Sequence, residues 1–424
     1  MSLLKQTILC TLLIFSLLPQ AWSESVRTSD AGGDWENRKT KTIKTAKTPD
    51  SRNRFGGWAK HQVAEPGYFR VTQLGKKWWF IDPEGCLFLT VGVNSVDPDR
   101  VNTQDKNAWS LETSTLLQNA GFNTIGRWSK PQAFEKTQRQ IPYCGTLGFM
   151  REYFRQHSTL NGVTREFNQT IPVFDPQWVQ FCQEYAQTKT ETTRDDPYLI
   201  GYFSDNELDF RPDALTRYLS LSEDDPSRQG AENWLKENKL SSSSKKNPKT
   251  QAAFLEFVAQ QYFETVASAL KAADPNHLYL GSRLHGRCIS EPVLQASQVC
   301  DVVSINLYHH WKPERQDTSL FTKWSQRPFL VGEFYAMKVD SRRTKAEGAG
   351  FRVLKHEEAG EFYHTFTAAL LKNVPNCVGW HWFKYADDFD YAQKGIVSLK
   401  GEPHQPLIEA MTILNNQAYS LRRK

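Results

Sequence analysis

Residues 199–207, Leu199-Ile200-Gly201-Tyr202-Phe203-Ser204-Asp205-Asn206-Glu207, form an apolar run that ends in a carboxylate. The run is hydrophobic almost throughout, without alternation, which is typical of a strand buried on both faces of a parallel sheet. A second run of this kind, Pro328-Phe329-Leu330-Val331-Gly332-Glu333-Phe334, also closes on a glutamate. Each run predicts a buried parallel strand with a glutamate at its carboxyl end.

Strand and helix patterns alternate along the chain on both sides of these two runs. The strand candidates are Phe88–Asn94, Asn123–Trp128, Ile141–Gly148, Leu199–Glu207, Leu278–His285, Val302–Tyr308, Phe329–Phe334 and Val378–Phe383. The helix candidates are Ser110–Ala120, Pro131–Gln138, Pro176–Lys189, Gln251–Ala273, Glu291–Ala296, Ser319–Ser325, His356–Asn373 and Pro406–Leu414. This repetition predicts an α/β fold, a (β/α)8 TIM barrel. A doubly wound open sheet is the alternative, although no GxGxxG follows an early strand.

The N-terminal part of the chain divides into three segments. Residues 1–23 have a positive start, a short apolar stretch and a small-x-small site at Ala21–Ser23, which predicts a secretory signal peptide. Residues 24–66 are predominantly polar and predict a disordered or irregular leader. Strand and turn signals from Tyr68 to Ile81 predict a small β-hairpin, so residues 67–424 form the predicted catalytic domain.

Composition excludes some functions and leaves others open. The formal net charge is only +5, and no basic stripe suited to nucleic acid is present. No segment after the signal peptide is long and apolar enough to span a bilayer. Six cysteines follow residue 23; we expect mostly buried thiols, although Cys288 and Cys300 are near enough in sequence to pair.

Glu207 and Glu333 are the residues on which a functional hypothesis can be built. Catalytic groups of parallel α/β barrels lie at the carboxyl ends of the strands. Strands four and seven lie nearly opposite each other in such a barrel, so the two carboxylates would face one another. Such a pair is what cleavage of a glycosidic bond requires. We predict Glu207 as the acid/base and Glu333 as the nucleophile; two surface carboxylates in salt bridges are the alternative.

Other polar and aromatic residues at strand ends are candidates for substrate binding. They are Asn206, Asn94, Arg127, His285, Tyr308 and Trp382. Asn206 could hold the hydroxyl beside the reacting carbon, and Arg127 or Tyr308 could keep Glu333 ionised. The histidines lack the spacing of a metal site, and we expect neither a metal nor an organic cofactor.

The motifs Gly201-Tyr202-Phe203-Ser204-Asp205-Asn206-Glu207-Leu208 and Val331-Gly332-Glu333-Phe334 resemble those of clan A glycoside hydrolases. More narrowly, they are similar to glycoside hydrolase family 50, the β-agarases. The resemblance covers about residues 69–414. It implies a TIM barrel with Glu207 as acid/base and Glu333 as nucleophile. After Glu207 the sequence Asp209-Phe210-Arg211-Pro212 departs from the family pattern.

The sequence thus predicts an exported retaining β-glycoside hydrolase, secreted or periplasmic, that acts on a polysaccharide or oligosaccharide. A β-linked galactan similar to agarose is the predicted substrate. A galactosidase or mannanase on the same barrel is one alternative. A non-catalytic glycan-binding barrel is another, although binding alone does not require two opposed carboxylates.

Overall fold

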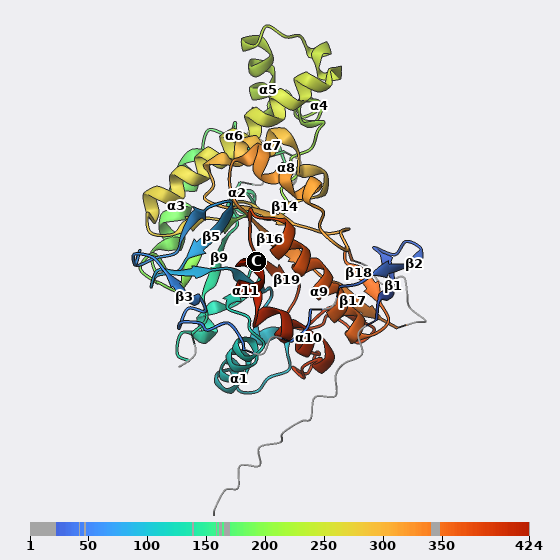
Figure 1. Cartoon of the computed structure of the whole chain (residues 1–424). Helices are drawn as coiled ribbons and strands as arrows, with labels where there is room; N and C mark the ends of the chain where they lie inside the picture. The colour runs from blue at the N-terminus through green and yellow to red at the C-terminus, as the bar shows by residue number, and fades with distance from the viewer. Residues whose placement is uncertain are drawn as a thin grey trace, which may run out of the picture.

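The fold was determined as a computed structural model, which describes residues 23–423 except 42, 46–47, 138–139, 158, 161–162, 165–169 and 341–347. The predicted signal peptide therefore lies outside the described residues, apart from Ser23. The chain forms a mixed α/β structure around a curled sheet of parallel strands (Figure 1).

The central sheet has nine strands in the order β13-β12-β9-β8-β7-β19-β16-β15-β14, and every neighbouring pair is parallel. The strands are β7 (Thr90–Val93), β8 (Thr124–Ile125), β9 (Tyr143–Leu147), β12 (Leu199–Ser204), β13 (Leu278–Tyr279), β14 (Leu284–His285), β15 (Val303–Asn306), β16 (Phe329–Phe334) and β19 (Cys377–Trp382). Each of the eight predicted strands is confirmed at its core, and the fifth is divided into β13 and β14. The two ends of the sheet order therefore belong to one short chain segment, residues 278–285.

Helices connect the strands, mostly where the sequence predicts them. They are α1 (Lys106–Asn119), α2 (Phe149–Gln156), α3 (Trp178–Thr190), α6 (Pro248–Ala273), α7 (Glu291–Ala296), α8 (Arg315–Ser325), α9 (His356–Asn373), α10 (Gln405–Asn415) and α11 (Ala418–Arg423). The helix expected from Pro131 is only a 3-10 turn, Pro131–Phe134. The short helices α2 and α11 were not predicted.

The predicted N-terminal hairpin is confirmed as β4 (Arg70–Leu74) and β5 (Lys77–Ile81), joined by β6 (Cys86–Phe88) and β3 (Trp58–Gln62). Its aromatic side chains pack under the first residues of the central strands. The cluster contains Phe55, Phe69, Phe80, Phe88, Ile200, Leu278, Val302, Leu330 and Val378. This small antiparallel sheet therefore closes the amino end of the central sheet with apolar groups.

The irregular leader predicted at residues 24–66 differs from the structure, which forms strands there. Strands β1 (Ser25–Asp30) and β2 (Trp35–Lys39) join β18 (Phe351–Val353), β17 (Ala336–Val339) and β20 (Ala392–Gln393) in the order β2-β1-β18-β17-β20. Strands β1 and β2 consist mainly of polar residues, so the apolar pattern of a strand is missing from their sequence. The buried Thr28 hydroxyl donates to the carbonyl of Arg352 at 2.6 Å.

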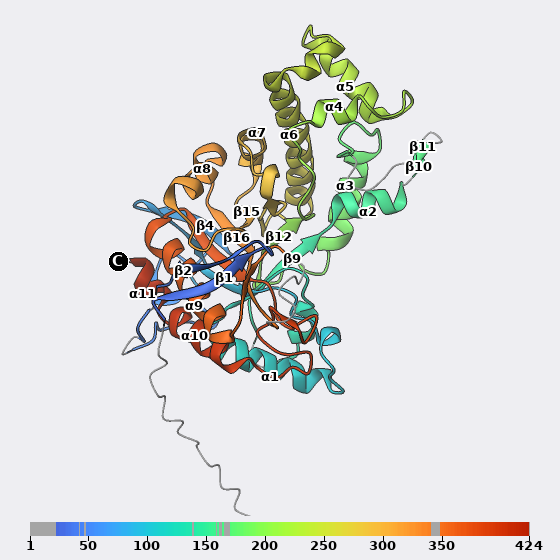
Figure 2. The same ribbon diagram turned by 90° about the vertical axis from the view of Figure 1, so that its right-hand side faces the viewer.

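The insertion after β12 forms two helices, α4 (Ala214–Tyr218) and α5 (Pro226–Glu237). Figures 1 and 2 show them projecting with one end of α6 beyond the rest of the molecule. The 26 residues of α6 give it a length of about 39 Å, at 1.5 Å per residue. Because α6 begins on the carboxyl side of the strands, its first turns carry α4 and α5 above that side.

The six described cysteines are free and buried, in agreement with the prediction of buried thiols. Burial raises the pKa of Cys86, Cys288 and Cys377 to about 11 each, so these thiols stay protonated at neutral pH. No described helix is long and apolar enough to cross a bilayer.

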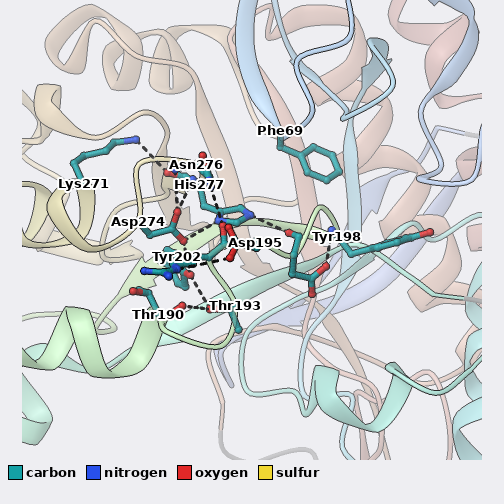
Figure 3. Close-up of polar contacts among 12 residues, drawn as sticks. Phe69, Thr190, Thr193, Asp195, Tyr198, Tyr202, Lys271, Asp274, Asn276 and His277 are labelled. Carbon is teal, nitrogen blue, oxygen red and sulfur yellow. Dashed lines mark hydrogen bonds and ion pairs between the residues drawn. The ribbon is translucent and has the colours of Figure 1, made fainter.

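A buried polar network ties β12 to the chain before β13 (Figure 3). The carboxylate of Asp274 accepts hydrogen bonds from the Tyr202 hydroxyl at 2.7 Å and from Nδ1 of His277 at 2.8 Å. The other ring nitrogen of His277 lies 2.9 Å from the carbonyl oxygen of Asp196. Burial raises the pKa of Asp274, but the bonds from His277 and Tyr202 outweigh it and leave the pKa below its usual value.

We expect Asp274→Asn to lower the free energy of unfolding by about 3 kcal/mol, because it removes the charged acceptor of two buried hydrogen bonds. Asp195→Asn is the matched control: its side chain is 79% exposed and lies 3.7 Å from Arg194, so the change should stay within about 0.5 kcal/mol. Chemical denaturation measures both. Because the folded-state pKa is lowered, the contribution of Asp274 is complete above pH 3.8 and is lost as the pH falls through the folded-state pKa. Equal losses of unfolding free energy in the two variants would contradict the stabilising role given to Asp274.

Candidate active site

The backbone at the carboxyl ends of the central strands adopts an unusual conformation. Nine described residues other than glycine have positive φ, and six of them lie at these strand ends: Ser95, Trp128, Asp205, Glu207, Arg283 and His309, with φ between 51° and 64°. Left-handed backbone is unfavourable for residues with a Cβ, and it concentrates at functional sites. The carboxyl end of the sheet is therefore the candidate site.

Glu333 lies on β16 and is only 6% exposed. One carboxylate oxygen pairs with the Arg283 guanidinium at 2.8 Å. The other accepts a hydrogen bond from the Tyr308 hydroxyl at 2.6 Å. Both partners donate hydrogen bonds to the carboxylate, and the arginine also brings a positive charge to it.

Glu207 follows β12 and is partly exposed. Its Oε1 accepts a hydrogen bond from Nδ2 of Asn306 at 2.7 Å. Asn306 is the register neighbour of Glu333 across β15 and β16. The structure thus brings the two predicted glutamates to one network, although they are far apart in sequence.

Arg283 is the centre of this network. Its guanidinium donates to Oδ1 of Asn206 at 2.9 Å and to the carbonyl of Gly332 at 2.8 Å, besides pairing with Glu333. The side chain is fully buried, and its charge lies over the Phe203 ring at 5.4 Å. One planar cation therefore fixes residues next to both glutamates at once.

Asp205 has a structural role. Its carboxylate accepts hydrogen bonds from the Met150 backbone at 3.0 Å and from the Tyr262 hydroxyl at 2.7 Å. It thereby caps the amino end of α2. Burial raises the pKa of Asp205, although these donors and Arg127 oppose that effect.

Arg127 and Asn94 are buried and donate hydrogen bonds to backbone carbonyls next to the two glutamates. Arg127 is 4% exposed and donates to the carbonyl of Asp205, so Arg283, and not Arg127, is the arginine paired with Glu333. Burial, together with the nearby Arg283 charge, lowers the pKa of Arg127 to about 9. Asn94 is fully buried and donates to the carbonyl of Gly332 at 2.8 Å, next to Glu333.

Among the aromatic candidates, Tyr308 contacts Glu333, His285 packs against Tyr308, and Trp382 does not face the site. The His285 ring packs edge-on against Tyr308 at 5.5 Å. Trp382 is fully buried: its indole packs against Phe334, and Nε1 donates to the carbonyl of Lys394 at 2.9 Å. Trp382 therefore has no exposed face for a sugar, and we leave it out of the site.

Arg283 and Asn306 were absent from the predicted site. Both lie inside apolar runs that the sequence marks as buried strands, and a charged or amide side chain in such a run needs a buried partner. A polar residue within an apolar run was therefore the feature of the sequence from which these two residues could have been identified. Among the described residues, no group of three or more His, Cys, Asp or Glu side chains could hold a metal ion.

Two curated proteins and one solved structure are similar to this chain. The chain is 24% identical to β-agarase B of Vibrio sp. (strain JT0107), with 90% of this chain and 52% of that protein covered. It is 26% identical to β-agarase A of the same strain, with 74% and 36% covered. The chain thus spans about half or less of these relatives. No protein-family model matches it.

The structure superposes on the crystal structure of BpGH50 with a TM-score of 0.85 and 26% identity, over 94% of this chain and 95% of that one. The match extends over nearly the whole of both chains. The chain is therefore similar in sequence to two β-agarases and in structure to BpGH50.

We expect Arg283→Lys to lower kcat on a glycan substrate about 10²-fold, the equivalent of losing one hydrogen bond to a charged group. Lysine keeps the charge but cannot reach Asn206, Gly332 and Glu333 together. Arg287→Lys, at an exposed position four residues later, is the control and should behave as the parent. An unchanged kcat for Arg283→Lys would contradict the role given to this arginine.

Proposed function

We propose that this chain is a retaining β-glycoside hydrolase of the family 50 type, within clan A, that cleaves a β-linked galactan similar to agarose. The observation that carries the proposal is the network in which Arg283 and Tyr308 hold Glu333 while Asn306 holds Glu207. The names of the two Vibrio relatives support the choice of agarose. Asn206, Asn94, Arg127, His285 and Tyr308 complete the proposed site.

We also propose that the central sheet closes into a (β/α)8 barrel through residues 278–285. The backbone N–H of Leu280 donates to the carbonyl of Tyr202 at 2.8 Å, on the side of β12. On the opposite side, Val302 donates to the carbonyl of Tyr279 at 3.2 Å, and Leu284 pairs with Ile305. One segment thus bonds to both β12 and β15, as closure requires.

In the first step of the proposed reaction, Glu333 attacks the anomeric carbon and the glycosidic C–O bond breaks. Glu207 gives its proton to the leaving oxygen, which departs as a sugar hydroxyl. The partly exposed position of Glu207 suits contact with that oxygen. Asn206, oriented by Arg283, is placed beside the acid and would hold the neighbouring sugar hydroxyl.

In the second step, water replaces Glu333 on the anomeric carbon. Glu207, now a carboxylate, takes a proton from that water, and the Glu333 carboxylate is released with the ion pair to Arg283 restored. Two inversions give net retention of configuration. This mechanism requires the two carboxyl groups to lie about 5–5.5 Å apart. It uses water and substrate alone.

The proposed enzyme acts outside the cytoplasm, secreted or in the periplasm. The support for this is the sequence pattern of residues 1–23. An insoluble galactan is too large to enter a cell, so its hydrolysis requires an exported enzyme. The proposed partner is the polysaccharide or oligosaccharide substrate.

Glu333→Ala should lower the release of reducing ends from agarose at least about 10³-fold, because the covalent intermediate cannot form. Sodium azide should restore turnover of an activated galactoside by that variant and give a glycosyl azide of inverted configuration. Glu207→Gln should lower kcat about 10²–10⁴-fold, the range for a lost general acid. Glu264→Gln, on the exposed face of α6, should keep parent activity.

The same assay over agarose, porphyran and galactomannan separates the proposed substrate from its rivals. We expect the parent to release reducing ends from agarose most rapidly. Faster release of reducing ends from galactomannan would show that the substrate is a mannan and not a galactan. Binding without release from any of the three would support a glycan-binding barrel and overturn the proposed mechanism.

A further inference from the structure

The loop after β19 carries a pair of exposed aromatic rings, Phe389 and Tyr391. They are 53% and 37% exposed, and their rings stack 5.1 Å apart with an interplanar angle of 18°. Among the described residues, six other large hydrophobic side chains are exposed, and none of them is aromatic. The pair lies on the same side of the sheet as Glu207 and Glu333, because its loop follows the carboxyl end of a central strand.

Buried polar contacts hold the base of this loop in place. Asp388, just before Phe389, pairs with the buried Lys384 and with Lys394, the latter at 3.1 Å. The neighbouring Asp387 accepts hydrogen bonds from the Gly395 backbone at 2.7 Å and from Nε2 of His404 at 2.7 Å. Such partners restrict the loop, so the rings are presented in a fixed position and not on a loose tip.

The loop is also part of the second sheet. Residues 392–393 form β20, which pairs with β17, and Asp340 donates its backbone N–H to the carbonyl of Tyr391 at 3.2 Å. Strand β17 begins two residues after β16 ends. The strand that carries Glu333 therefore continues directly into the sheet at whose edge the aromatic pair lies.

A row of rings leads from Glu333 to this edge. Tyr308, bonded to Glu333, packs against Tyr335 at 5.6 Å, and Tyr335 lies 6.0 Å from the half-buried Phe383. The Lys394 ammonium lies 5.4 Å from the centre of the Tyr335 ring and 5.1 Å from that of Phe383. It also pairs with Asp388. The aromatic pair is thus the outer end of a continuous set of contacts that starts at the proposed nucleophile.

We propose that Phe389 and Tyr391 form a distal subsite that binds a pyranose unit of the same glycan chain, several units from the bond that is cleaved. The inference rests on the proposed function and adds that the enzyme favours long substrates. The apolar C–H face of a sugar ring packs well on a flat aromatic face, and the carboxylate of the exposed Asp390, between the two rings in sequence, can bind hydroxyls. A protein partner is less suitable, since two rings are far smaller than the roughly 1,200 Å² that a stable interface buries.

The test compares the double variant Phe389→Ala/Tyr391→Ala with the parent on agarose and on the shortest agaro-oligosaccharide that the parent cleaves. The ratio of kcat/KM for the polymer to kcat/KM for the short substrate should fall about tenfold, as expected when stacking on an aromatic pair is lost. The variant Phe389→Tyr/Tyr391→Phe keeps both rings and should retain the parent ratio. Leu111→Ala, which removes a 51% exposed apolar side chain from α1, is the matched control.

Retardation in agarose gels gives a second readout that does not depend on turnover. The Glu207→Gln enzyme with its native loop should be retarded in the gel. The same enzyme carrying Phe389→Ala/Tyr391→Ala should migrate faster. An unchanged kcat/KM ratio and unchanged retardation in an enzyme that cleaves agarose would overturn the subsite and leave the proposed function intact. A parent chain that neither cleaves nor binds any galactan would overturn both.

Discussion

The buried guanidinium of Arg283 is the interaction on which the rest of the site depends. A cation taken out of water needs close partners, and three are present: the Glu333 carboxylate, the Asn206 amide oxygen and the Gly332 carbonyl. These partners come from the ends of β12 and β16, so the arginine fixes the relative position of the segments that carry both glutamates. Arg127 brings a second buried cation nearby, and Asp205 with Glu333 supplies the two opposing carboxylates.

The two ends of the central sheet are built from opposite kinds of chemistry. The amino end is filled by phenylalanines from the N-terminal sheet and by aliphatic residues at the starts of the strands. At the carboxyl end, buried polar groups and left-handed turns replace them. The apolar end stabilises the fold, which lets the other end hold groups that are unfavourable on their own. This division explains why the strands start apolar and close on polar residues.

Much of the architecture could be predicted from the sequence, because unbroken apolar runs such as 199–204 and 329–334 have few structural solutions. The glutamates could be identified for the same reason: each stands where an apolar run ends. The sheet formed by β1, β2, β17, β18 and β20 could not, because β1 and β2 are polar and β1 joins β18, more than 300 residues later in the chain. The direction in which individual side chains point could not be predicted from the sequence either. Trp382 and Arg283 both sit on predicted strands, yet packing against Phe334 buries the first and the ion pair with Glu333 brings the second into the site.

The central claim is that Glu333, held by Arg283, forms a bond to the sugar while Glu207 serves as acid. The most direct measurement is mass mapping of peptides after reaction with an activated 2-deoxy-2-fluoro-β-galactoside, which traps a glycosyl-enzyme. The account predicts one label, on Glu333. A label on Glu207 or another residue, or turnover of the parent galactoside with product of inverted configuration, would contradict it.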